Sequence, residues 1–249
     1  MNTLELAQHC DQWGYTRYWL SEHHNGMGLS SAAPEILIGH VANVTKRIRV
    51  GSGGIMLPNH SALKVAESFR LLETLHPGRI DLGLGRAPGT DMLTAQALRR
   101  SNADRDTFPS QLEELLGFLG DGFPAVHPYS KIIAVPDDAD CPQLWILSSS
   151  GYGAQVAAER GLGLAFAHHI HPDPAIAALR MYQQSFRPSR HFQNPQSILT
   201  VAAVCADDLA EAERLASSFD LVRLRIEQGK GGKFPSVEAI RIPGTHADR

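Results

Sequence analysis

The spacing of apolar residues alternates between the period of a strand and the period of a helix, and this alternation limits the folds open to the chain. Strand-like segments are expected at residues 15–20, 48–57, 80–84, 144–147, 164–167 and 197–204. Helix-like segments are expected at residues 3–13, 34–45, 61–75, 109–119, 153–160, 173–186 and 207–218. Strands separated by helices favour an α/β fold with a parallel sheet. Periodicity alone leaves a doubly wound open sheet and a (β/α)8 barrel as alternatives.

Two stretches do not follow the alternation. Residues 101–141 contain one of the expected helices and a short hairpin expected at 126–135. Residues 229–249 have no apolar period and are rich in glycine and lysine at their start, so we expect a loosely held C-terminal tail. We find no internal repeat and no linker, and we expect residues 1–228 to form a single domain.

Composition excludes several classes of protein. Apolar residues make up 43% of the 249 residues, enough for one domain with a sizeable core. Lys and Arg number 23 against 26 Asp and Glu, a formal charge of −3, which offers no positive field for nucleic acid or anionic lipid. The cysteines form no C-x-x-C pair, and charged residues interrupt the first thirty positions. We therefore expect a cytoplasmic protein without disulfides, signal peptide or membrane segment.

Functional residues of parallel α/β folds collect at the carboxyl ends of the strands. The first such junction contains Glu22, His23 and His24. A carboxylate beside two imidazoles suits proton transfer, because histidine titrates nearest neutral pH and the carboxylate can fix its tautomer. The alternative is a polar strand end with surface histidines. We take these three residues as candidate catalytic residues.

The second and third junctions are rich in glycine. Three glycines in the strand segment 51–54 leave room for a flat molecule to lie against the backbone, although a β-bulge at a barrel corner explains them equally well. Segment 83–91 places Arg86 on a glycine-rich turn, where it can clamp an anion. Pro88 stands where a dinucleotide fingerprint would have its third glycine, so a Rossmann assignment is weak.

The fourth junction runs from Ser148 to Tyr152 and leads directly into a helix. Hydroxyl groups and unpaired backbone N–H groups would then meet at the positive end of that helix, as in a phosphate site. Ordinary N-capping by a serine is the alternative. The fifth junction contains His168, His169 and His171, but no acidic partner at a strand end completes a metal site, so we expect no metal.

Three segments at these junctions are specific enough to compare with known families: residues 18–24 (YWLSEHH), 49–60 (RVGSGGIMLPNH) and 76–91 (HPGRIDLGLGRAPGTD). They closely resemble the bacterial luciferase-like monooxygenase family, and a looser match continues to about residue 219. The resemblance implies a TIM-like (β/α)8 barrel with FMN as cosubstrate. It also implies that reduced flavin and O2 oxidise a small organic substrate such as an aldehyde. A separate reductase would supply the reduced FMN, because the chain has no convincing nicotinamide fingerprint.

The resemblance also implies roles for single residues. His23 matches the family's active-site histidine, with its two neighbours in the motif beside it. Gly53 and Gly54 match the strand end that passes against the isoalloxazine ring, where relatives hold a non-proline cis peptide. Arg86 matches an arginine that contacts the FMN phosphate. The other side of the phosphate cradle is matched by Ser148, Ser149, Ser150, Gly151 and Tyr152.

Compared with that family, the chain lacks the first and eighth strands of the barrel. These strands are neighbours in a closed barrel, so their loss leaves one open slot with two exposed edges. We expect a homodimer, both because such edges pair readily and because family members dimerise through helices that correspond to 34–45 and 61–75. Two other functions remain open: a flavin-binding protein without turnover, similar to a shortened luciferase relative, and a metal-dependent barrel hydrolase that uses the paired histidines.

Overall fold

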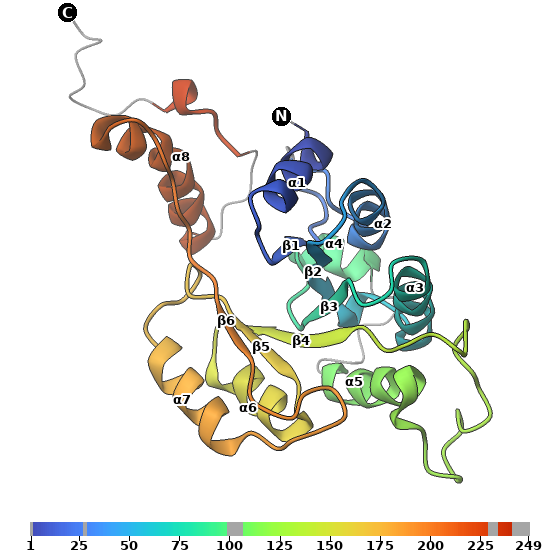
Figure 1. Cartoon of the computed structure of the whole chain (residues 1–249). Coiled ribbons are helices and arrows are strands. Elements are labelled where there is room, and N and C mark those ends of the chain that lie inside the picture. The colour runs from blue at the N-terminus through green and yellow to red at the C-terminus, as the bar shows by residue number, and fades with distance from the viewer. Residues whose placement is uncertain (1, 27–28, 99–106, 229–233, 241–249) are drawn as a thin grey trace, which may run out of the picture. The chain divides into compact units, whose positions relative to one another are not determined.

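The structure is a computed structural model that describes residues 2–26, 29–98, 107–228 and 234–240 (Figure 1). The chain divides into two compact units. The first contains residues 1–24 and 31–201, and the second contains residues 25–30 and 202–249. All candidate site residues belong to the first unit. In the part of the chain that is described, no helix combines the length and apolar character needed to cross a membrane.

One six-stranded sheet forms the first unit. Its strands are β1 (Arg17–Leu20), β2 (Arg49–Met56), β3 (Ile80–Gly85), β4 (Gln143–Ser148), β5 (Gly163–Phe166) and β6 (Ser197–Leu199). They are hydrogen-bonded in sequence order from β1 to β6. Every neighbouring pair is parallel, so all six carboxyl ends lie at the same edge of the sheet.

Six helices of this unit pack on one face of the sheet. They are α1 (Thr3–Gln12), α2 (Pro34–Val44), α3 (Ala62–Leu75), α5 (Phe108–Leu116), α6 (Gly151–Arg160) and α7 (Ala175–Ser185). Ile80, Leu82 and Leu84 alternate along β3 and are buried in one core with apolar residues of these helices. Asp81 and Gly83 therefore point to the opposite, inner face.

The strand order decides between the two architectures that periodicity left open. A doubly wound sheet reverses its strand order and carries helices on both faces. Here the order is monotonic and one core joins the sheet to its helices, as in a (β/α)8 barrel. The described residues supply six strands, so the sheet is a curled, open segment of a barrel. The predicted barrel without its first and eighth strands is confirmed.

A buried carboxylate fixes the amino-terminal ends of β1, β2 and β3 on the inner face. Asp81 is fully buried, and its side chain accepts hydrogen bonds from Arg17 Nε at 3.0 Å and from the indole N–H of Trp19 at 2.9 Å. Arg49 Nη2 lies 2.7 Å from the same carboxylate. Because Arg17 is also the register partner of Arg49, one acidic side chain forms ion pairs with two neighbouring cations.

Local sequence sets the ends of several helices. Pro34 begins α2, where its missing N–H group costs no hydrogen bond. The side chain of Ser61 accepts a hydrogen bond from the Lys64 amide and caps α3. Gly161 ends α6 with a φ of 62°, and a Cβ there would lie 2.4 Å from the Arg187 carbonyl oxygen, so the position requires glycine.

The structure differs from the sequence predictions around residues 120–140. The hairpin expected at 126–135 does not form, and these residues make turns instead. Buried Arg70 of α3 holds this region by donating hydrogen bonds to the carbonyl oxygens of Phe118, Pro136, Asp137 and Ala139, at 3.1–3.4 Å. One guanidinium thus anchors the chain on both sides of the expected hairpin, at Phe118 and at residues 136–139.

Other element boundaries also differ. The strand expected at 197–204 ends at Leu199, and a short helix that was not predicted, α4 (Met92–Leu98), follows β3. Helix α8 (Leu209–Glu227) of the second unit is longer than the predicted 207–218. Of the predicted tail, residues 229–233 and 241–249 lie outside the described residues, and the rest contains the short helix η3 (Val237–Ala239).

Candidate functional site

Glu22 lies just past β1, and its carboxylate is the best-connected polar group at the carboxyl edge of the sheet. The side chain is fully buried. Oε1 accepts hydrogen bonds from His24 Nε2 at 2.7 Å and from the side-chain amide of Asn59 at 3.1 Å. Oε2 accepts the backbone N–H of Met56 at 2.8 Å, and His60 Nε2 lies 3.0 Å from both oxygens. Four groups from the ends of two strands thus converge on one carboxylate.

The hydrogen bonds decide the charge of this cluster. Burial raises the pKa of Glu22, but hydrogen bonds from His60, His24 and the Met56 amide outweigh burial and lower the pKa below its ordinary value. The hydrogen bond with Glu22 in turn raises the pKa of His60, against the opposing effect of burial. Glu22 is therefore ionised at neutral pH and acts as an acceptor.

His23 belongs to a second set of contacts, with the loop that follows β3. Its Nδ1 lies 3.3 Å from the Gly89 carbonyl oxygen, which can only accept, so a neutral ring carries its hydrogen on Nδ1 and leaves Nε2 as the accepting nitrogen. The His24 amide also donates to Gly89, at 3.2 Å, and the Thr90 hydroxyl donates to the His24 carbonyl at 2.8 Å. The two imidazole rings thus have different partners, Gly89 for His23 and Glu22 for His24.

Gly89 must be glycine for this loop to approach β1. Its φ is 66°, a left-handed conformation that side chains disfavour. A Cβ at this position would lie 2.8 Å from the Glu22 carbonyl oxygen. The glycine-rich turn that carries Arg86 is therefore fixed against the loop that carries the acid–base candidates.

The glycine segment of β2 has the two properties that the sequence suggested. The register with β3 shifts between Ser52 and Ile55, which is the bulge, and the peptide bond between Gly53 and Gly54 is cis, as the family resemblance implied. A Cβ on Gly53 would lie 3.1 Å from Trp19 Cβ, and one on Gly54 would lie 2.7 Å from the Gly83 carbonyl oxygen. Bare backbone is thus presented at this strand end.

Two tryptophans line the inner face near these glycines. The rings of Trp19 and Trp145 meet edge to face, with centroids 5.7 Å apart. Trp145 is buried, and its indole N–H has no hydrogen-bond partner among the described residues. An unpaired buried donor is costly, so this N–H is available to a group that enters the inner face.

Arg86 lies next to the first turn of α6. The Arg86 guanidinium lies over the ring of Tyr152, 4.7 Å from its centroid. Ser150 occupies the N-cap position of α6, but its side chain makes no capping hydrogen bond. Instead, the Ser148 hydroxyl bonds within the turn, to the amide and carbonyl of Ser150 at 3.1 and 3.0 Å. A cation and a helix N-terminus without a side-chain cap thus lie next to one another.

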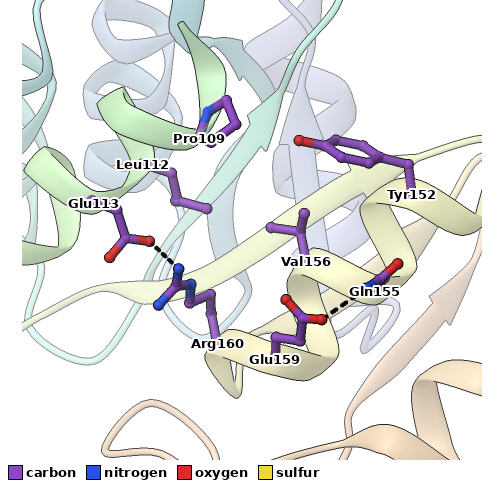
Figure 2. A pocket seen from close by; sticks show the side chains of 8 residues that line it. All are labelled: Pro109, Leu112, Glu113, Tyr152, Gln155, Val156, Glu159 and Arg160. Carbon is purple, nitrogen blue, oxygen red and sulfur yellow. Dashed lines mark hydrogen bonds and ion pairs between the residues drawn. The ribbon is translucent and has the colours of Figure 1, made fainter. Parts of the chain in front are cut away.

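A pocket of about 230 Å³ lies between α5 and α6 (Figure 2). Tyr152, Leu112 and Val156 contribute its apolar lining, and an ion pair of 2.7 Å between Arg160 and Glu113 crosses its far side. Tyr152 is the one residue that it shares with the predicted site. The pocket therefore lies outside the inner face and holds none of the acid–base candidates.

The fifth junction contains no metal centre in the described part of the chain. No group of three or more His, Cys, Asp or Glu side chains could hold an ion there or elsewhere in the described ranges. His169 is bonded instead to the Thr200 hydroxyl at 2.9 Å.

Sequence reasoning missed Asn59 and His60, which both contact Glu22. The signal was present, because both residues lie within the segment 49–60 that carries the family resemblance. Of the predicted residues, the structure joins His24 to Glu22 and Arg86 to Tyr152, whereas the His23 ring contacts Gly89. Gly53 and Gly54 lie on β2, between β1, which precedes Glu22, and β3, which precedes Arg86.

Comparison with known proteins shows the family of the chain. Residues 1–235 match the family model described as luciferase-like monooxygenase. The chain belongs to the luciferase-like monooxygenase family. It is accordingly an oxidoreductase.

Relatives in this family cover nearly the whole chain. The uncharacterized protein YceB of Bacillus subtilis (strain 168) is 46% identical over 250 residues, which are 100% of this chain and 76% of YceB. A luciferase-like monooxygenase of Escherichia coli (strain K12) is 44% identical over 235 residues, 94% of this chain and 69% of that protein. The crystal structure of apo-MsnO8 is 39% identical with a TM-score of 0.84, and the match covers 94% of this chain and 69% of MsnO8.

Proposed function

We propose that the chain binds FMN and uses its reduced form with O2 to oxidise a small organic substrate, with aldehydes as the first class to test. The observation that carries the proposal is the Arg86 guanidinium stacked on Tyr152 beside the α6 N-terminus, where the N-cap residue Ser150 makes no capping hydrogen bond. A planar guanidinium and free helix N–H groups together suit a phosphate dianion. Membership of the luciferase-like monooxygenase family supports the reaction type.

A more distant structure supports the choice of flavin. The oxygenating constituent of 3,6-diketocamphane monooxygenase from Pseudomonas putida, a type II Baeyer-Villiger monooxygenase, was solved in complex with FMN. It shares the fold with a TM-score of 0.64 at 19% identity, over 91% of this chain and 70% of that chain.

The inner face fits the flat ring system of a flavin. Gly53 and Gly54 present backbone without side chains, and a Cβ on Gly53 would press on Trp19 at 3.1 Å. The unpaired indole N–H of buried Trp145 offers a donor on the same face. The ring would lie against this strand end while the phosphate occupies the cradle of Arg86, Ser148, Ser149, Ser150, Gly151 and Tyr152.

The residues around Glu22 supply proton handling in this proposal. Reduced FMN, when bound, supplies the electrons that activate O2. Glu22 stays ionised and fixes a hydrogen on Nε2 of a neutral His24, which leaves Nδ1 as the accepting nitrogen. His23, with Nδ1 turned to Gly89, offers Nε2. Each histidine can accept or return one proton at its accepting nitrogen while the other ring nitrogen keeps its hydrogen bond, to Glu22 for His24 and to Gly89 for His23.

The proposal includes partners and location. A separate reductase supplies reduced FMN, and the protein works in the cytoplasm. A homodimer forms through α2 and α3, whose outer faces expose Ile36 (62%), Leu71 (51%) and Leu75 (61%). Apolar side chains exposed to this degree on adjacent helices favour an interface. Sedimentation should show a dimer for the wild type and a monomer for L75D, and a monomeric wild type would refute this part.

Calorimetric titration with FMN tests the function. R86A should lose charge-assisted hydrogen bonds worth about 1.5–3 kcal/mol, which weakens binding about ten- to a hundredfold. R180A removes an exposed arginine on α7 and serves as the matched control. Equal affinity of R86A and R180A would overturn the phosphate cradle.

Adding O2 to the protein with reduced FMN and aldehydes of several chain lengths then tests turnover. Product formation supports the monooxygenase. FMN binding without any substrate oxidation would instead support the flavin-binding protein without turnover.

A further inference from the structure

His60 is the second imidazole on the Glu22 carboxylate, and it comes from a different strand end. It directly follows the short helix η1 (Leu57–Asn59) after β2. Its Nε2 is 3.0 Å from each Glu22 oxygen, although the two residues are 38 positions apart. The Gln111 side-chain amide of α5 donates to the His60 carbonyl oxygen at 3.0 Å. The residue is thus held at its ring and at its backbone.

Hydrogen-bond chemistry restricts the protons of this cluster. The Met56 amide and the Asn59 side-chain amide can only donate to Glu22. An ionised carboxylate only accepts, so His24 and His60 must both present N–H at Nε2. A proton on Glu22 would have to point at one of these nitrogens, which would then have to accept. The charge of Glu22 and the tautomers of both histidines are therefore coupled.

We propose that His60 is a positioning residue: its N–H, shared by both carboxylate oxygens, keeps Glu22 ionised and thereby keeps the neutral His24 ring in the Nε2–H tautomer. His24 then retains Nδ1 as its accepting nitrogen. The consequence for catalysis rests on the proposed function, whereas the effect on Glu22 does not.

The groups that act on the His60 ring lie on two other elements. Glu22, shared with His24, faces it from the end of β1, and Glu35 of α2 adds a second negative charge. One oxygen of Glu35 is buried and has no hydrogen-bond partner among the described residues. Both carboxylates favour a hydrogen on His60, and the raised pKa of His60 agrees with this.

NMR titration of the full chain without flavin tests the proposal. Glutamate labelled with ¹³C at the carboxyl group reports the pH at which Glu22 takes up a proton, and ¹⁵N-labelled histidine reports the tautomer of His24. In H60L the Glu22 midpoint should rise by about one pH unit or more, because its bridging donor is lost. In the wild type at neutral pH, the ¹⁵N signals should place the hydrogen of the neutral His24 ring on Nε2, where it faces Glu22.

Two further variants complete the comparison. H60Q keeps an N–H donor, so its Glu22 midpoint should lie close to that of the wild type. H40Q replaces an exposed histidine of α2, and its Glu22 midpoint should equal that of the wild type. If H60L does not fold, H60N replaces it, since its shorter amide cannot reach the carboxylate, and the same rise is expected. A Glu22 midpoint in H60L or H60N equal to that of the wild type would overturn the proposal.

Flavin experiments separate this proposal from the proposed function. With reduced FMN and O2, the acid limb of the pH–rate profile for flavin oxidation should move upward in H60L by the same shift as the Glu22 midpoint. FMN affinity should stay unchanged at neutral pH, where Glu22 is ionised in both proteins. Failure of the wild type to bind FMN would refute the proposed function, while the Glu22 titration would still decide the role of His60.

Discussion

Replacing Glu22 by glutamine tests the buried carboxylate directly. Glutamine has nearly the same shape, but one of its two terminal atoms becomes an NH2 donor. If the NH2 group replaces Oε2, it faces the Met56 amide and His60; if it replaces Oε1, it faces His24, His60 and the amide of Asn59. Either orientation sets donor against donor in a site without solvent.

The expected loss of stability follows from these contacts. One buried donor without an acceptor costs about 1–3 kcal/mol, and the remaining hydrogen bonds lose about 1 kcal/mol in total when the acceptor is no longer charged. We therefore expect E22Q to lower the free energy of unfolding by about 2–4 kcal/mol. For a chain of this size that corresponds to a fall in Tm of roughly 5–15 °C.

Urea denaturation of wild type, E22Q and the matched control E113Q measures the effect. The Glu113 carboxylate is 51% exposed and makes one ion pair with Arg160, so its replacement should cost less than about 1 kcal/mol. If E22Q loses no more stability than E113Q, the carboxylate is not held as described here.

The free energy of unfolding should depend on pH in a direction that the pKa shifts of Glu22 and His60 determine. Because the pKa of Glu22 is lowered on folding, its contribution is present above its unfolded pKa and is lost as the pH falls through its folded pKa. The difference between wild type and E22Q should therefore shrink in acid. The pKa of His60 is raised, so its contribution is present below its unfolded pKa and is lost as the pH rises through its folded pKa.

Three further predictions concern other residues. H23A should bind FMN with near-normal affinity in calorimetry but turn over about 10²- to 10⁴-fold more slowly, and equal turnover would remove His23 from the mechanism. R70M should lower the free energy of unfolding by about 2–4 kcal/mol and make residues 120–140 sensitive to protease, because the carbonyl of Phe118 and its neighbours lose their donor. Burial raises the pKa of Cys141 to about 12, so iodoacetamide should label exposed Cys205 and spare Cys141 in peptide mass mapping.

The sequence predicts the elements of the fold well because their signals are local. Period-two apolar spacing identifies β3, where Ile80, Leu82 and Leu84 face the helices, and glycine or proline marks most element ends. Strand order is not local, which is why periodicity could not separate a barrel from a doubly wound sheet. The incorrect hairpin at 126–135 has the same origin. Its apolar residues have the spacing of strands, but the chain on both sides of them is held by Arg70, which is 66 positions before Pro136.

Some residues of the candidate site are recognisable from local sequence, whereas others are found only in the structure. Glu22, His23 and His24 adjoin one another in the sequence, so their chemistry is visible without a structure. Asn59 and His60 were missed, because the turn of η1 after β2 decides that they point back toward Glu22. A residue type that suits acid–base chemistry is therefore recognisable from sequence, whereas the residues that fix its proton are found only by geometry.

The contacts at the carboxyl edge link successive strand ends into one rigid assembly. Glu22 joins the loop after β1 to the loop after β2 through Met56 and His60. Asn59 donates both to Glu22 and to the Pro88 carbonyl, at 3.1 Å each, and so adds the loop after β3. That loop also carries Arg86, which stacks on Tyr152 after β4. A change in the protonation of Glu22 therefore acts on the same loops that form the proposed phosphate cradle. Proton transfer and cofactor position thus depend on the same hydrogen bonds between these loops.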